Sequence, residues 1–162
     1  EKNFSGKLPY TYPKYDGVIE FYDRPRSVDR SNLGDFAAFN PEWHFGFGLH
    51  YGEVSYEHLK SNEVLSDNAP WEITVDVINQ SNREIDEVVQ LYVGYEFASM
   101  IPAGEQLKRF QKVKIPAGQT VEVRFVLNKE DLMFVNEAGD WVFEPGKFNF
   151  SIGTKKGSVV FK

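Results

Sequence analysis

Three histidines between residues 44 and 58 are the side chains best suited to bind a metal ion. His44 and His50 are six residues apart, and His58 follows eight residues later. A zinc site needs deprotonated ligands that converge at about 2 Å from the metal, usually with a carboxylate or a fourth ligand. Two glycines lie between His44 and His50, so their side chains have no fixed relative direction. We therefore expect hydrogen-bonded histidines and no metal site.

Several carboxylates near the same segment could serve glycoside hydrolysis, which needs two carboxyl groups about 5–10 Å apart. The candidates are Glu42, Glu53 and Glu57, and Trp43 beside Glu42 could stack on a sugar ring. No second carboxylate at the end of a predicted strand accompanies them. We therefore interpret Glu42 as a solvated side chain next to a packing tryptophan, and we expect no catalytic residue in this chain.

The composition excludes several other functions. The chain has no cysteine, which excludes disulfides, zinc thiolate sites and cysteine nucleophiles. Its net charge of −6 argues against nucleic acid as a partner, because phosphate binding needs a basic face. No apolar run approaches the ~20 residues that span a membrane, and no phosphate-binding loop or dinucleotide fingerprint is present. We expect no cofactor, no nucleic-acid partner and no membrane partner.

Residues 1–52 form the first of two regions and are rich in aromatic side chains. Twelve of the chain's 25 aromatic residues lie here, without a strand or helix period, and four prolines break any long helix. Each buried aromatic ring contributes roughly 1.5–3 kcal/mol. This extended arm is therefore predicted to pack against its own domain, against a missing domain, or against both.

A dense mixed-charge stretch lies within the arm, from Asp23 to Asp35. As a solvated loop it would contribute little, since exposed ion pairs are worth about 0–1 kcal/mol each. As an interface, its arginines could bind carboxylates of a neighbouring domain through two guanidinium N–H groups at once. Both interpretations stay open.

From residue 53 to residue 162 the chain is predicted to form a second, all-β region. Residues 71–77, 121–127 and 148–152 alternate apolar and polar side chains. Further strands are predicted at 85–93, at 107–115 with Phe110 near its inner face, in a hairpin at 133–143, and at an edge, 158–161. Residues 129–132 are predicted to form one helical turn. About seven short strands joined by turn residues are typical of an immunoglobulin-like β-sandwich. The predicted core comprises Trp71, Val75, Val89, Leu91, Phe125, Leu127, Trp141 and Phe148.

Seven motifs, in the right order along the chain, resemble one family. Residues 5–13 (SGKLPYTYP) resemble the end of the second domain of glycoside hydrolase family 3 enzymes, and residues 45–51 (FGFGLHY) resemble the family's Phe-Gly-x-Gly-Leu-Ser-Tyr connector, with His50 in place of serine. The segments 87–93, 107–113, 116–118, 130–132 and 141–148 resemble the fibronectin type III-like domain that closes many of its β-glucosidases. Residues 22–24 and 39–43 look most like versions from Bacteroidetes. The chain opens at Glu1 without an initiator methionine, which suits a piece of a longer polypeptide.

The resemblance implies a specific role. Family members remove β-linked terminal glucose, or a related sugar, with retention, using an Asp nucleophile in an N-terminal barrel and a Glu acid/base in an α/β domain. Neither catalytic motif is present, so this chain is expected to be inactive by itself. The complete enzyme is expected to be periplasmic or secreted. It is expected to stabilise the catalytic domains and help to shape the site entrance. The residues expected to contact those domains are Tyr12, Tyr22, Arg24, Arg26, Trp43, Phe45, Phe47 and Tyr51.

Two other functions stay open at this point. One is a carbohydrate-binding module, for which Tyr92, Tyr95 and Phe97 would form an aromatic platform near one strand end. The other is an adhesion or assembly sandwich without a link to sugars.

Overall fold

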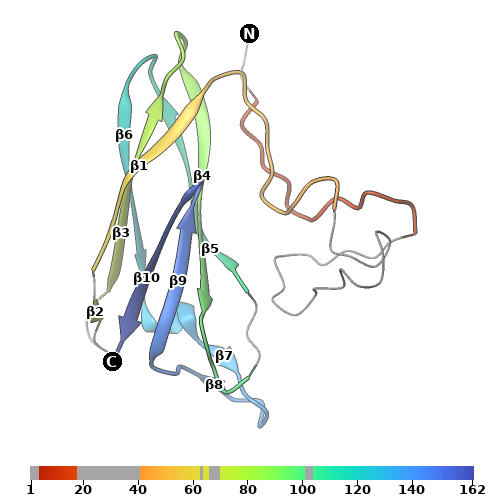
Figure 1. The fold of residues 1–162 in the computed structure, drawn as a ribbon, viewed down its shortest axis with the longest axis vertical. Helices are drawn as coiled ribbons and strands as arrows, with labels where there is room; N and C mark the ends of the chain where they lie inside the picture. The colour runs from red at the N-terminus through yellow and green to blue at the C-terminus, as the bar shows by residue number, and fades with distance from the viewer. Residues whose placement is uncertain (1–3, 18–40, 63, 66–69, 101–103) are drawn as a thin grey trace.

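The computed structural model describes residues 4–17, 41–62, 64–65, 70–100 and 104–162. Its main body is a sandwich of two twisted sheets (Figure 1). The smaller sheet has three antiparallel strands in the order β1-β3-β6. These strands are β1 (Val54–Ser61), β3 (Trp71–Asn79) and β6 (Thr120–Leu127).

The larger sheet has the order β2-β10-β9-β4-β5. All of its pairings are antiparallel except that of β2 with β10. Its strands are β2 (Val64–Leu65), β4 (Ile85–Tyr95), β5 (Gln106–Ile115), β9 (Gly146–Ile152) and β10 (Lys155–Phe161). At the lower end of the sandwich lie the helical turn η2 (Lys129–Leu132) and a hairpin of β7 (Phe134–Val135) and β8 (Trp141–Val142).

The core lies between the two sheets because the inward-facing positions of their strands are apolar. β3 alternates buried and half-buried side chains along its whole length, as expected of a strand with one face in the core. At one end of the core the Trp71 ring meets Phe150 edge to face at 5.2 Å, and Trp71 Nε1 donates a hydrogen bond to Ser61 Oγ at 2.7 Å. Seven of the described strands have seven or more residues, which confirms the predicted all-β sandwich.

Two predictions about the core are wrong. Phe110 is exposed, because it pairs with the half-buried Gln90 while Val113 pairs with the inward-facing Glu87. Residues three apart in a strand point to opposite faces, so Phe110 and Val113 could not both point inward. Trp141 is also exposed, since β8 belongs to the short hairpin outside the two sheets. Phe143 packs against the core in its place.

A buried asparagine joins two turns at the upper end of the sandwich. Asn79 Nδ2 lies 2.8 Å from the carbonyl oxygen of Arg83 and 3.0 Å from that of Ile115. Asn79 Oδ1 accepts a hydrogen bond from the backbone N–H of Ser81 at 2.9 Å. This side chain therefore connects the β3–β4 turn, predicted from its polar residues, to the end of β5.

Candidate functional site

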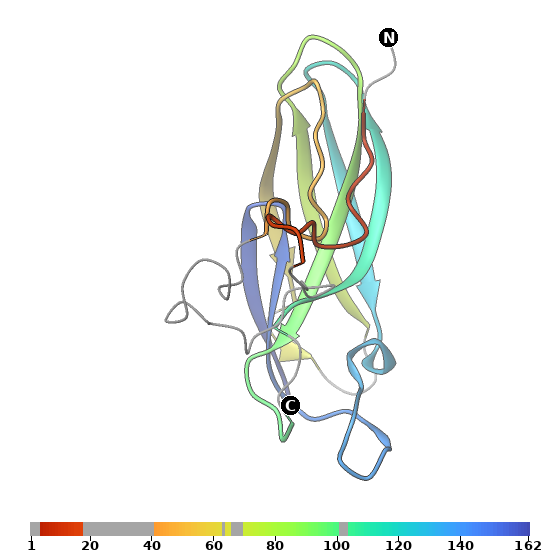
Figure 2. The same cartoon turned by 90° about the vertical axis from the view of Figure 1, so that its right-hand side faces the viewer.

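Two segments from the first 51 residues pair side by side and project from the sandwich (Figures 1 and 2). We call residues 4–15 and 41–51 together the ribbon. Leu8 N donates to Phe47 O at 2.7 Å, and Gly46 N donates to Leu8 O at 2.8 Å. Farther out, Tyr12 N donates to Trp43 O at 2.8 Å. The two segments thus pair through backbone hydrogen bonds with each other, and the ribbon belongs to neither sheet.

The glycines of residues 45–51 allow the ribbon to approach its neighbours closely. Gly46 has φ +81°, and a Cβ there would lie 2.0 Å from the Tyr92 hydroxyl. A Cβ on Gly48 would lie 2.4 Å from the carbonyl oxygen of Gly6. The first glycine therefore permits contact with β4, and the second permits contact between the two segments.

One face of the ribbon exposes large apolar side chains. Trp43 stacks on Phe47 with 6.0 Å between ring centroids, and Tyr12 lies 5.1 Å from Trp43. Beside this cluster is an open apolar depression of about 480 Å³. Leu49 is 70% exposed and Phe4 is 65% exposed. We define the ribbon's apolar face as Phe4, Tyr12, Trp43, Phe47, Leu49 and Tyr51.

The expected contact residues divide into three groups. Tyr12, Trp43, Phe47 and Tyr51 all belong to the apolar face. Phe45 differs, because it is only 5% exposed and its ring meets Tyr92 of β4 edge to face at 6.3 Å. Tyr22, Arg24 and Arg26 lie outside the described residues.

A buried carboxylate holds the ribbon to the sandwich. The side chain of Glu87 is 3% exposed, and its Oε1 lies 2.8 Å from Lys7 Nζ. The Tyr56 hydroxyl donates to the same oxygen at 3.2 Å, and His50 Nε2 lies 3.9 Å from Oε2. Burial raises the pKa of Tyr56, and the Glu87 carboxylate acts in the same direction. Tyr56 is therefore a neutral hydrogen-bond donor to Glu87.

Glu87 was predicted only as part of a strand motif. The sequence does carry a signal for its role, because Glu87 occupies an inward position between the buried residues Ile85 and Val89. A charged residue at such a position needs a partner of opposite charge. What the sequence does not show is that Lys7 supplies that partner.

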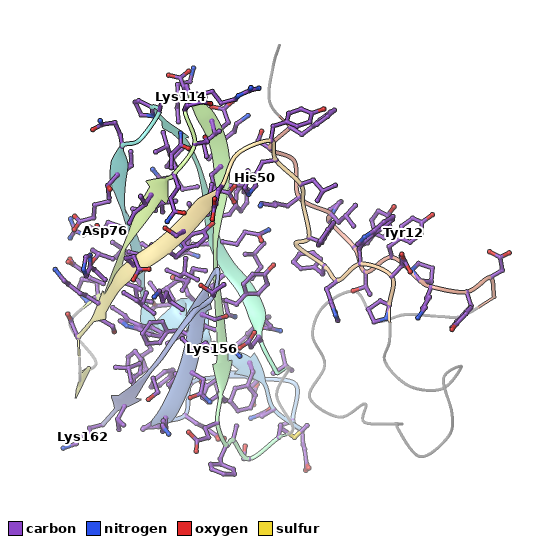
Figure 3. The ribbon with its side chains drawn as sticks, turned by 45° about the horizontal axis from the view of Figure 1, so that its top comes forward. Tyr12, His50, Asp76, Lys114, Lys156 and Lys162 are labelled. Carbon is purple, nitrogen blue, oxygen red and sulfur yellow. The ribbon has the colours of Figure 1, made fainter. Side chains whose placement is uncertain are left out.

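The histidines occupy separate places. His50 lies beside Glu87, where the ribbon meets the sandwich, as its label in Figure 3 shows. His58 lies at an irregularity of β1, has φ 48°, and its Nδ1 is 2.9 Å from Asp76 Oδ2. In the described ranges no three or more histidine, aspartate or glutamate side chains are grouped so that they could hold a metal ion. Of the candidate carboxylates, Glu57 accepts a hydrogen bond from Lys155 at 3.0 Å.

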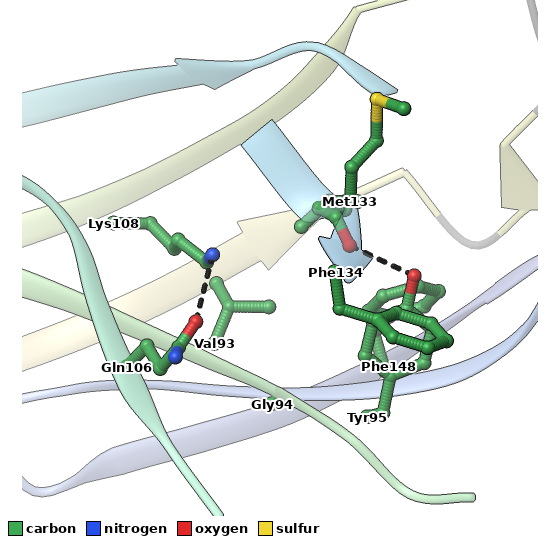
Figure 4. Close-up of a pocket in the computed structure, with 9 residues that line it drawn as sticks. Val93, Gly94, Tyr95, Gln106, Lys108, Met133, Phe134 and Phe148 are labelled. Carbon is green, nitrogen blue, oxygen red and sulfur yellow. Dashed lines mark hydrogen bonds between the residues drawn. The ribbon is translucent and has the colours of Figure 1, made fainter. Parts of the chain in front are cut away.

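The predicted aromatic platform for sugar does not form. Tyr92 and Tyr95 are buried, and of the three residues only Phe97 is exposed. Tyr95 donates to the Leu132 carbonyl at 2.8 Å (Figure 4). Burial is the main cause that raises the pKa of Tyr95 to about 12. The cavity beside Tyr95 measures only about 30 Å³, far below the ~300–1,000 Å³ of pockets that hold drug-sized ligands.

Known proteins resemble the chain over nearly its whole length. Residues 87–156 match the model of the fibronectin type III-like domain. The chain is 32% identical to a putative β-xylosidase of Formosa agariphila, over 98% of this chain and 21% of that protein. It is 32% identical to a periplasmic β-glucosidase of Salmonella typhimurium, over 97% of this chain and 22% of that protein. A β-glucosidase from Listeria innocua superposes with a TM-score of 0.87 and 27% identity, over 99% of this chain and 25% of that one.

The chain matches the C-terminal part of glycoside hydrolase family 3 enzymes. It spans about a fifth to a quarter of the length of these relatives. Relatives from Bacteroidetes are among them, which confirms the expected resemblance. The family 3 relatives align with the ribbon as well as the sandwich, whereas the fibronectin type III-like match begins at Glu87 in β4. No helix among the described residues is long and apolar enough to cross a membrane.

Proposed function

We propose that this chain is a non-catalytic C-terminal module that stabilises the catalytic domains of a family 3 β-glucosidase. In this proposal, residues 1–52 form the docking arm and connector, and residues 53–162 form the fibronectin type III-like sandwich. The supporting observation is the ribbon's apolar face, which is exposed in a chain that spans only a fifth to a quarter of its relatives.

The energetics of the face favour an apolar partner. Burying an aromatic or leucine side chain is worth roughly 1.5–3 kcal/mol, and contiguous exposed apolar patches mark contact surfaces. Three contacts hold the inner part of the ribbon against β4. They are the Phe45–Tyr92 ring contact, the Lys7–Glu87 ion pair and the close approach of Gly46 to the Tyr92 hydroxyl. The face is therefore presented in a defined direction, which lowers the entropic cost of docking.

The proposed partners are the N-terminal barrel and the α/β domain of the same enzyme. These domains would supply the nucleophile and the acid/base for retaining hydrolysis of terminal β-D-glucosyl residues. The catalytic site of the parent enzyme, and not this module, would bind the β-glucoside. The ribbon would help to shape the entrance to that site. A periplasmic or secreted location is supported by the relative named as a periplasmic β-glucosidase.

The test uses the full-length enzyme that contains this chain. Trp43→Ala combined with Leu49→Ala should lower its melting temperature and shorten the half-life of its glucosidase activity on heating. The control is Trp141→Ala, because Trp141 is also an exposed tryptophan but lies on the β7–β8 hairpin. Equal effects of the two changes, or unchanged activity and melting temperature after deletion of the whole chain, would contradict the proposal.

A further inference from the structure

The open apolar depression of about 480 Å³ is formed by both segments of the ribbon. The first segment contributes Phe4, Gly6, Lys7 and Leu8, and the second contributes Trp43, Phe47, Gly48 and Leu49. Backbone hydrogen bonds from Leu8 to Phe47 and from Gly46 to Leu8 hold the two walls together. The depression therefore exists in the chain on its own, before any partner binds.

Two glycines keep the depression open. A Cβ on Gly48 would lie 2.4 Å from the carbonyl oxygen of Gly6 and 2.6 Å from Lys7 Cδ, so a glycine lets the two segments approach this closely. A Cβ on Gly6 would meet nothing within 4 Å, and Gly6 does not have a positive φ. A side chain at position 6 would thus extend without strain into space that the glycine leaves empty.

The lining is apolar because its one charge is bound elsewhere. Of the described residues that line the depression, Lys7 alone is charged, and its Nζ lies 2.8 Å from Glu87 Oε1 on β4. The hydrocarbon stem of a lysine bound in this way can cover apolar surface. Besides Lys7, only the Trp43 indole brings a polar side-chain group to the lining. A ligand rich in hydroxyl groups would find few hydrogen-bond partners here, whereas an apolar group fits.

The depression lies close to where the rest of the enzyme would join the chain. The chain matches the C-terminal fifth to quarter of its relatives, so the α/β domain of the proposed parent enzyme would precede Phe4. Phe4 itself lines the depression, and three residues of chain span at most about 11 Å. The α/β domain would therefore be tethered beside the depression, which gives its surface a high effective concentration there.

We propose that the depression receives one large apolar side chain, aromatic or leucine-like, from the α/β domain of the same enzyme. This inference rests on the proposed docking of the ribbon and adds the place where that contact is centred. The depression is within the ~300–1,000 Å³ of pockets that hold drug-sized groups, so it has room for such a side chain. An apolar side chain in a preformed pocket, with a rim that excludes water, is typical of the residues that dominate an interface.

The first experiment fills the depression from within the chain. In the full-length enzyme, Gly6→Leu should shorten the half-life of glucosidase activity on heating about fivefold or more, because the new side chain takes the space of the partner's. Gly6→Ala should have almost no effect, since one methyl group leaves most of that space open. In the 162-residue chain alone, both variants should melt within about 2 °C of the unsubstituted chain. Equal half-lives of the two full-length variants would overturn the proposal.

The second experiment measures whether the depression is covered, and it decides the matter if Gly6→Leu destabilises the chain itself. The chain has no cysteine, so Gly6→Cys supplies its only thiol, at the wall of the depression. Iodoacetamide should label this thiol about tenfold or more slowly in the full-length enzyme than in the 162-residue chain, because a buried group reacts only when the contact opens. Mass spectrometry of the peptide that contains residue 6 gives the rate.

The control for labelling is Ser158→Cys, at an exposed position of β10 far from the ribbon in sequence. Its thiol should react at the same rate in the full-length enzyme and in the chain alone. Equal slowing of the two thiols, no slowing at residue 6, or slow labelling of residue 6 already in the chain alone would each overturn the proposal.

Failure of this inference can be told from failure of the proposed docking. If Trp43→Ala combined with Leu49→Ala shortens the half-life while Gly6→Leu does not, the ribbon docks but its depression receives no side chain. If the Trp43 and Leu49 variant also leaves the enzyme unchanged, the docking itself is wrong.

Discussion

Lys7 Nζ lies 2.8 Å from Glu87 Oε1, so a residue of the ribbon neutralises a carboxylate buried in β4. This ion pair joins the two regions of the chain. Glu87 faces the interior of the sandwich, where an unpaired carboxylate would be strongly unfavourable. The position of the ribbon and the stability of the sandwich are therefore coupled through these two side chains.

The ion pair predicts a large effect for a single substitution. Lys7→Met removes the cation and leaves Glu87 buried without it, so the free energy of unfolding should fall by about 3 kcal/mol. Urea unfolding of the 162-residue chain measures this change. Lys114→Met, which breaks the exposed pair with Glu84, should cost no more than about 1 kcal/mol. Similar losses of unfolding free energy for the two variants would show that the buried Lys7–Glu87 pair contributes no more than an exposed pair.

The glycine contacts predict different effects for three glycines of the ribbon. Gly46→Ala places a methyl group against the Tyr92 hydroxyl at a backbone angle that disfavours alanine, so we expect a loss of about 1–3 kcal/mol. Gly48→Ala should also destabilise the chain, because backbone atoms of Gly6 cannot move aside easily. Gly6→Ala is the control, since a Cβ there meets nothing within 4 Å. Thermal unfolding of the three variants checks this order, and a Gly6→Ala variant as unstable as Gly46→Ala would contradict it.

The raised pKa of Tyr95 predicts a loss of stability in alkali. The ordinary pKa is 10.0 and the folded value is about 12, so folding favours the neutral phenol. This contribution is fully present below pH 10 and is lost as the pH rises from 10 to about 12, because the unfolded chain releases the proton first. Tyr95→Phe should make the free energy of unfolding less dependent on pH in that window. Tyr10→Phe, at an exposed ribbon residue, should keep the dependence of the parent chain.

The ribbon's apolar face predicts binding of a hydrophobic dye by the chain on its own. Phe47→Ser combined with Leu49→Ser should lower the fluorescence of bound anilinonaphthalene sulfonate. Since both side chains are substantially exposed, the free energy of unfolding should change by no more than about 1 kcal/mol. Phe110→Ser removes an exposed ring of β5 and should leave most of the dye signal. A larger loss with Phe110→Ser would place the main apolar surface on β5.

The sequence by itself determined the strands whose signal is local. Residues 71–77 and 121–127 alternate with a period of two, and this period directly reflects one buried face. The helical turn at 129–132 also has a local signal, because Asn128 stands at the N-cap position before it. β1 was not predicted as a strand, because its residues are mostly half-buried and its pairing shifts near His58. The aromatic richness of residues 1–52 indicated a packing arm, but it did not show which rings face inward.

Only the tertiary structure decided which side chains meet. Phe45 turns to Tyr92 while Phe47, two residues later, stacks on Trp43 in the ribbon's apolar face. Lys7 reaches Glu87, and Phe110 points outward, because strand register and the path of the ribbon bring together residues far apart in sequence. Contacts of this kind depend on how sheets pair and close, and no local period encodes that pairing.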